Sequence, residues 1–131
     1  MNTRRKFLAG ASTLALAAVV PAVGSTSEKK SLVHHVYFWL KNPSSSEDFA
    51  KLVEGVTSLK NIETLRQVKI GVPAKTTKRD VIDDSYSISL LTVFDDVNGH
   101  DTYQVHPIHI KFVEDYSHLW NKVIVYDSMD I

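Results

Sequence analysis

The chain has 131 residues, with 15 basic and 15 acidic side chains, 6 histidines and no cysteine. This length fits one domain, or one domain behind a leader. The lack of cysteine excludes a disulfide scaffold, thiolate zinc sites, a cysteine nucleophile and a lipoprotein anchor. Residues 1–24 hold three basic residues and no acid, so the rest of the chain has 12 basic and 15 acidic residues. This mildly acidic body gives no electrostatic reason to expect a nucleic-acid partner.

The first 24 residues are typical of a signal peptide. Two arginines and a lysine at positions 4–6 precede an apolar run over residues 14–20, and small residues follow it. This order of charge, apolar run and small residues indicates export. The run is shorter than the roughly 20 residues that span a membrane, and the arginine pair resembles the twin-arginine signal. We predict a twin-arginine-like signal peptide over residues 1–24 and a linker over 25–30. The protein is then periplasmic or otherwise exported, without stable membrane insertion after cleavage.

The rest of the chain alternates strand and helix patterns. Apolar residues at helical spacing follow an N-cap among the serines at 44–46, and a second helical region opens after Asp95 and Asp96. In that second region Pro107 suits the first turn of a new helix segment. Patterns rich in β-branched and aromatic residues predict strands over 32–40, 64–72, 86–94 and 122–126.

The order of these elements, β-α-β-β-α-β, predicts an α+β, ferredoxin-like fold. Such a fold has a four-stranded antiparallel sheet with two helices on one face. Both faces of the strand over 32–40 are largely apolar, so the face without helices also needs a cover. A second copy of the same sheet is the simplest cover. We therefore predict that residues 31–131 form a homodimer that packs sheet to sheet into an α/β barrel.

Two pairs of histidines are the main candidates for chemistry. His34 and His35 point to opposite faces of the first strand, and His106 and His109 flank Pro107. If Pro107 is the first helical residue, the positive helix end favours a neutral imidazole at His109, which suits a general base. Candidate partners in a ligand pocket are then Tyr103, which can hydrogen-bond a ligand carbonyl, and the aromatic residues Tyr37, Trp39, Phe112 and Trp120.

The same residues also have plain structural interpretations. A strand histidine such as His34 is usually packed and hydrogen-bonded, and His100 and His118 are expected on the surface. His106 and His109 supply only two metal ligands, so we predict no metal site. We also predict no cofactor, because the chain has no phosphate-binding glycine loop and no hydrolase or zinc-protease motif.

Three segments resemble the stress-responsive dimeric α/β-barrel (Dabb) family. They are the opening LVHHVYFWLK, the stretch YQVHPIH from Tyr103 to His109, and WNKVIVYD from Trp120 to Asp127. The resemblance covers about residues 31–128 and implies the same dimeric ferredoxin-like barrel. One plant member, olivetolic acid cyclase, performs an intramolecular aldol condensation. Its catalytic tyrosine and histidine fall here on Tyr103 and His109, and a further pocket histidine falls on His35.

Three functions remain open. The first is an exported homodimer, stress-related, that binds a small ligand in a pocket around His35, Tyr103, His106 and His109. The second is a cyclase, lyase or monooxygenase-like enzyme with His109 as the general base and Tyr103 binding an enolate oxygen. The third is a structural or stress-protective dimer without catalysis, in which the histidines are packing residues.

Overall fold

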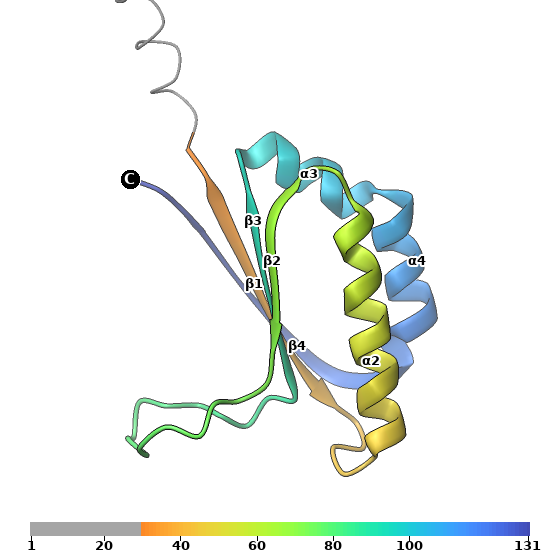
Figure 1. Cartoon of the computed structure of the whole chain (residues 1–131), viewed down its shortest axis with the longest axis vertical. Helices are drawn as coiled ribbons and strands as arrows, with labels where there is room; N and C mark the ends of the chain where they lie inside the picture. Colours follow the sequence, from red (N-terminus) through yellow and green to blue (C-terminus); the bar gives the residue numbers. More distant parts are fainter. Residues whose placement is uncertain (1–29) are drawn as a thin grey trace, which may run out of the picture. The chain divides into compact units, whose positions relative to one another are not determined.

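The computed structural model describes residues 30–131, so the predicted signal peptide and most of the linker lie outside the described residues. Within the described part, four strands and three α-helices follow the predicted order (Figure 1). The strands are β1 (Leu32–Leu40), β2 (Leu65–Gly71), β3 (Ile88–Phe94) and β4 (Trp120–Met129). The helices are α2 (Ser46–Ser58), α3 (Val97–Val105) and α4 (Pro107–Tyr116), with short 3₁₀ turns at Leu59–Asn61 and Ser117–Leu119.

The strands form one antiparallel sheet in the order β2-β3-β1-β4. The α2 and α4 helices lie side by side against one face of this sheet, and α3 lies at its end (Figure 1). Alternate residues of β1 and β3 are buried under the helices, as the period of two in a strand requires. The predicted fold is therefore confirmed, with the second helical region split into two helices.

Local capping explains where each helix begins. The Ser45 hydroxyl accepts a hydrogen bond from the Asp48 backbone N–H at the start of α2, and the Asp96 carboxylate accepts one from Gly99 at the start of α3. The α4 helix begins at Pro107, which has no N–H to leave unpaired. His106 caps α4, because its Nδ1 accepts a hydrogen bond from the Ile108 N–H at 3.1 Å.

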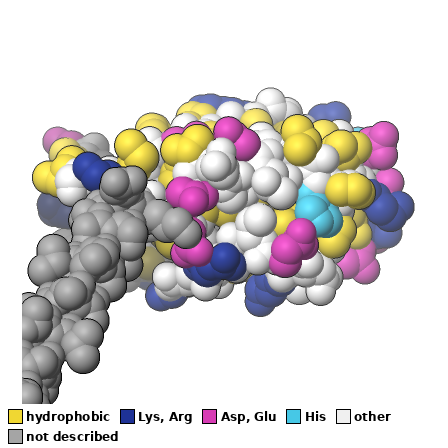
Figure 2. Space-filling view, turned by 90° about the horizontal axis from the view of Figure 1, so that it is seen from above, with side chains coloured by type: hydrophobic (Ala, Val, Ile, Leu, Met, Phe, Trp, Pro, Cys, Tyr) yellow, Lys and Arg dark blue, Asp and Glu magenta, His cyan; other side chains and the backbone are white. Residues whose placement is uncertain are grey.

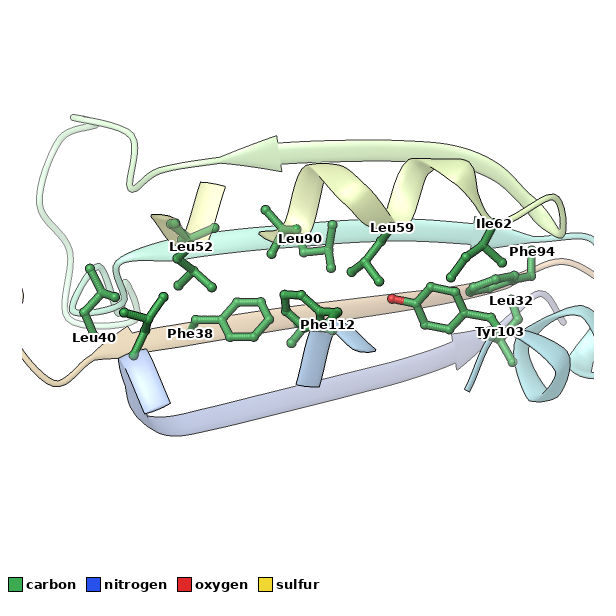
Figure 3. Packing of buried hydrophobic residues seen from close by; sticks show 14 residues of the cluster. Leu32, Phe38, Leu40, Leu52, Leu59, Ile62, Leu90, Phe94, Tyr103 and Phe112 are labelled. Atoms are coloured by element: carbon green, nitrogen blue, oxygen red, sulfur yellow. The ribbon is translucent and has the colours of Figure 1, made fainter. Parts of the chain in front are cut away.

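The core lies between the helices and the sheet (Figure 3). Each large apolar side chain that is fully buried there stabilises the fold by about 1.5–3 kcal/mol. The α2 helix contributes Leu52 and Val56, and Tyr103 of α3 is the largest fully buried side chain. The cluster consists of Leu32, Val36, Phe38, Leu40, Leu52, Val56, Leu59, Ile62, Ile88, Leu90, Phe94, Tyr103, Phe112 and Leu119.

The strand ends differ slightly from the predicted ones. The β4 strand runs from Trp120 to Met129 rather than from 122 to 126, because its backbone stays paired with β1 as far as the Leu32–Met129 pair. The loop between β2 and β3 is tied to β1, since the Trp39 indole donates to the Ser85 hydroxyl at 3.0 Å. No helix within residues 30–131 is long and apolar enough to cross a membrane.

Candidate functional site

Four titratable side chains gather on the helix-covered face of the sheet, and we call His34, His100, Tyr103 and His109 the histidine cluster. His34 comes from β1, His100 and Tyr103 from one face of α3, and His109 from the first turn of α4. The ring centroids are 4.8 Å apart for His34 and His100, 5.9 Å for His34 and Tyr103, and 4.8 Å for Tyr103 and His109. The first strand and two consecutive helices far from it in sequence therefore bring acid–base groups together.

The surroundings favour the neutral forms of His34, Tyr103 and His109. Burial lowers the pKa of His109, and the neighbouring His34 and His100 lower it further. Burial also lowers the pKa of His34, although its hydrogen bond to the Asp127 carboxylate acts in the opposite direction. The pKa of the Tyr103 hydroxyl is raised by burial. A neutral imidazole accepts a proton and a neutral phenol donates one, so the cluster holds both a base and a hydrogen-bond donor.

Two carboxylates border the cluster. His34 Nδ1 lies 2.5 Å from Asp127 Oδ1 on β4, and His100 Nδ1 lies 3.1 Å from Asp101 Oδ1. The other ring nitrogen of His100, Nε2, is buried and has no hydrogen-bond partner within residues 30–131. The predicted surface position of His100 is therefore wrong: its side chain is only 16% exposed and faces His34. The exposed position predicted for His118 is confirmed.

His106 has a structural role at the edge of this region. Its Nδ1 caps α4, and its Nε2 lies 3.3 Å from Glu63 Oε2. Both ring nitrogens of His106 therefore contact groups outside the histidine cluster. The structure does not place His106 with the ligand-pocket residues predicted from the sequence. Its neighbour His109, three residues further along, points toward Tyr103 instead.

The structure does not bring His35, Tyr37 and Trp39 together with Tyr103 and His109. The alternation of β1 puts these three residues on the open face of the sheet, opposite the helices. There the Tyr37 hydroxyl lies 3.2 Å from His35 Nδ1, and the two rings stack. A cavity of about 250 Å³ on this face is lined by Tyr37, Trp39, Asp83, Tyr86, Ile124 and Tyr126.

Phe112 and Trp120, also predicted as pocket residues, pack in the core instead. Their rings stack 5.6 Å apart, and Trp120 lies 4.9 Å from the Phe38 ring. Phe112 also reaches a shallow hollow between α2 and α4. Neither aromatic ring reaches the open-face cavity, because the core side of the sheet holds both.

The surface at one end of the molecule has mixed charge (Figure 2). Acidic and basic side chains are interspersed there with apolar ones, and little histidine surface is visible on that face. This arrangement differs from a continuous basic stripe, which is the usual footprint of a nucleic-acid site.

The described domain matches a known family. The family model for the Stress responsive A/B Barrel Domain, Dabb, matches residues 32–130. The chain belongs to this family. The resemblance seen in the three sequence segments is thereby confirmed.

Solved structures of other proteins share this fold. A Dabb family protein with a ferredoxin-like fold from Mesorhizobium loti is 23% identical, covers 78% of this chain and 98% of its own, and has a TM-score of 0.64. The hydroxynitrile lyase from Passiflora edulis is 16% identical, with 77% and 94% coverage and a TM-score of 0.64. A dimeric ferredoxin-like protein of unknown function from Thermobifida fusca is 14% identical, with 77% and 92% coverage and a TM-score of 0.62. Among curated proteins the comparison finds no match.

Sequence reasoning missed two residues of this site, His100 and Asp127. The spacing of His100 and Tyr103 at i and i+3 on one helix would have placed them together, had Tyr103 been recognised as the buried residue of α3. Asp127 reaches His34 only through the register of β1 and β4, which a single sequence does not specify. His34 is buried and hydrogen-bonded, as its structural interpretation predicted.

Proposed function

We propose that this Dabb chain is an exported homodimer that binds a small oxygen-bearing organic ligand at the histidine cluster. The observation that carries the proposal is the pairing of Tyr103 and His109, whose rings lie 4.8 Å apart. Tyr103 is buried, and its phenol hydroxyl is a group that can donate a hydrogen bond to a ligand oxygen. His109 is the neutral acceptor beside it.

The homodimer is supported by the open face of the sheet. This face carries Tyr37, Trp39, Ile124 and Tyr126, and Tyr126 alone is 64% exposed. Apolar and aromatic surface of this kind favours a protein partner. The dimeric ferredoxin-like proteins that share the fold support a second copy as that partner. The family description supports a role in stress, and the leader over residues 1–24 supports export.

A second candidate is catalysis at the same cluster. His109 would take a proton from a carbon or oxygen of the ligand, and Tyr103 would stabilise the negative charge that develops on an adjacent oxygen. The lowered pKa of His109 favours this role, because a base must be unprotonated at the working pH. The lyase from Passiflora edulis indicates that the fold accommodates an enzyme.

A thermal-shift screen tests the ligand site. The purified chain is screened with phenols, β-keto acids and quinones at fixed protein concentration, beside Tyr103→Phe and His109→Ala. A ligand at 100 times its Kd stabilises the native state by about 2.7 kcal/mol. The matched control is His118→Ala, which removes an exposed histidine outside the cluster.

We expect a ligand that shifts the melting temperature of the wild type and of His118→Ala, and whose effect disappears in His109→Ala. In Tyr103→Phe the shift in melting temperature should be smaller than in the wild type. Equal shifts in all four proteins would place the ligand elsewhere. If no ligand shifts the melting temperature, the structural dimer is favoured. For a ligand that binds, turnover lost in His109→Ala would establish the enzyme.

Analytical ultracentrifugation tests the dimer. Replacing Tyr126 by Lys puts a charge on the open sheet face and should yield monomers. Val105→Lys is the control, because Val105 is 70% exposed at the end of α3, among the helices. A wild-type monomer, or a Tyr126→Lys dimer, would contradict the proposal.

Export is tested separately by cell fractionation of the full chain and of the Arg4→Lys, Arg5→Lys double variant, which should stay in the cytoplasm.

A further inference from the structure

We propose that His34, His100 and Asp127 form a binding site for a divalent transition-metal ion of the Zn²⁺ type. Each of the three residues offers one ligand atom, and these atoms all lie within 4.8 Å of one another. Ligand atoms around a tetrahedral zinc ion lie ~3.3 Å apart, given bonds of about 2.0–2.2 Å. A side-chain adjustment of an ångström or so therefore completes the site. This inference does not depend on the proposed organic ligand.

The orientation of His100 is the first argument for the site. Its Nδ1 is 3.1 Å from the Asp101 carboxylate, while Nε2 is buried and has no partner within the described residues. A histidine that binds a metal through one nitrogen usually donates its other N–H to a carboxylate. A buried nitrogen without a partner is otherwise costly. A metal ion at Nε2 would satisfy it.

The contact between His34 and Asp127 is the second argument. His34 Nδ1 and Asp127 Oδ1 lie 2.5 Å apart, so a hydrogen bond joins them and one proton lies between the two atoms. A divalent cation can replace that proton, because metal binding to histidine and carboxylate releases protons. The Asp127 side chain is 47% exposed on the edge strand, so it can turn to admit the ion. The buried His34, at 7%, holds its side of the site fixed.

The donor set selects the class of metal. Two imidazole nitrogens and one carboxylate suit zinc and related transition metals, whereas Mg²⁺ and Ca²⁺ prefer oxygen ligands throughout. Three protein ligands leave at least one coordination position open for water or another small ligand. Tyr103 lies next to this set of ligands, with its ring 5.9 Å from that of His34.

Metal titration of the full, untagged chain tests the proposal. After treatment with a chelator, Zn²⁺ affinity is measured by competition with a chromogenic chelator, and Co²⁺ binding by its visible absorption. His100→Ala and Asp127→Ala each remove one ligand, Asp101→Ala removes the carboxylate behind His100, and His118→Ala removes an exposed histidine. Circular dichroism in chelator confirms that each variant is folded, and His34 is left intact because it is buried.

We expect one equivalent of Zn²⁺ or Co²⁺ per chain, with millimolar Mg²⁺ unable to displace it. His100→Ala and Asp127→Ala should weaken binding more than about 100-fold, and Asp101→Ala about 10- to 100-fold. His118→Ala should match the wild type. Absence of stoichiometric binding overturns the proposal, and so does undiminished binding in folded Asp127→Ala and His100→Ala. Because the organic screen is repeated in chelator, its failure and the failure of the metal site are distinguishable.

Discussion

His34 and Asp127 face each other across the pairing of β1 with β4, and their side chains meet at 2.5 Å. One partner is almost fully buried and the other is half-exposed on an edge strand. The contact therefore connects the edge of the sheet to its core. It also satisfies a ring nitrogen that the helices would otherwise cover, where an unpaired polar group is destabilising.

Removal of this carboxylate should destabilise the fold measurably. We expect Asp127→Ala to lower the free energy of unfolding by about 1 kcal/mol in the presence of a chelator, because His34 loses its partner while water replaces part of the contact. Asp130→Ala is the control, since Asp130 accepts only an exposed hydrogen bond from Ser31 and should change stability by less than about 0.5 kcal/mol. Urea denaturation measures both, and equal effects would contradict the interpretation.

The elements of the fold could be predicted because their patterns are strong. The β1 strand has the predicted bounds of 32 and 40, and Pro107 marks the start of α4. The end of β4 could not be predicted, because Asp127, Ser128 and Met129 have no strand-like side-chain pattern. Backbone pairing with β1 keeps them extended, and that pairing is a property of the assembled sheet.

The site could be predicted only in part. The positions of Tyr103 and His109 follow from the helix break at His106 and Pro107, and the structure brings the two rings together. The choice between His34 and His35 could not be made, because both faces of β1 are apolar and alternation alone does not say which one the helices cover. His100 was missed because α3 carries a weak apolar pattern, with Tyr103 as its buried residue.

Two substitutions at Tyr103 separate its ring from its hydroxyl. Tyr103→Phe should change stability little, because it keeps the buried ring that fills the core. Tyr103→Ala should cost about 3–5 kcal/mol through the cavity it leaves. Thermal or urea unfolding checks both values. A large loss in Tyr103→Phe would indicate that the hydroxyl is engaged in the free protein.

The packing of α2 against α4 depends on Gly55. A Cβ at this position would lie 2.7 Å from Tyr116 Cγ, and the Tyr116 hydroxyl donates to Glu54 at 3.0 Å, which holds the ring in place. We expect Gly55→Ala to destabilise the protein by about 1–3 kcal/mol, although alanine favours helices by about 1 kcal/mol over glycine.

Gly99 in α3 provides the matched control for Gly55. A Cβ there would meet Asp96 Oδ1 at 3.5 Å, an ordinary contact, so Gly99→Ala should be neutral or stabilising by up to about 1 kcal/mol. Urea denaturation of the two alanine variants measures the difference. A double variant, Gly55→Ala with Tyr116→Ala, should show less than the sum of the two single losses, because the clash is then relieved.

Protonation of His109 should lower the free energy of unfolding as the pH decreases below 6.5. Its pKa in the folded chain lies below the ordinary value of 6.5, because burial and the facing His34 and His100 disfavour its charged form beside Tyr103. Above pH 6.5 both the folded and the unfolded states are neutral at this group. As the pH falls from 6.5 to the lowered pKa, the unfolded chain binds more protons, so the free energy of unfolding decreases and then levels off.

Chemical denaturation between pH 8 and pH 5, in chelator, measures this dependence. His109→Gln should lose less stability than the wild type below pH 6.5, whatever its stability at pH 8. It should retain the part of the slope due to His34, whose pKa is also lowered by burial. His118→Gln, which replaces an exposed histidine, should run parallel to the wild type. Parallel curves for wild type and His109→Gln would mean that His109 is not held neutral by the fold, and would weaken its assignment as a base.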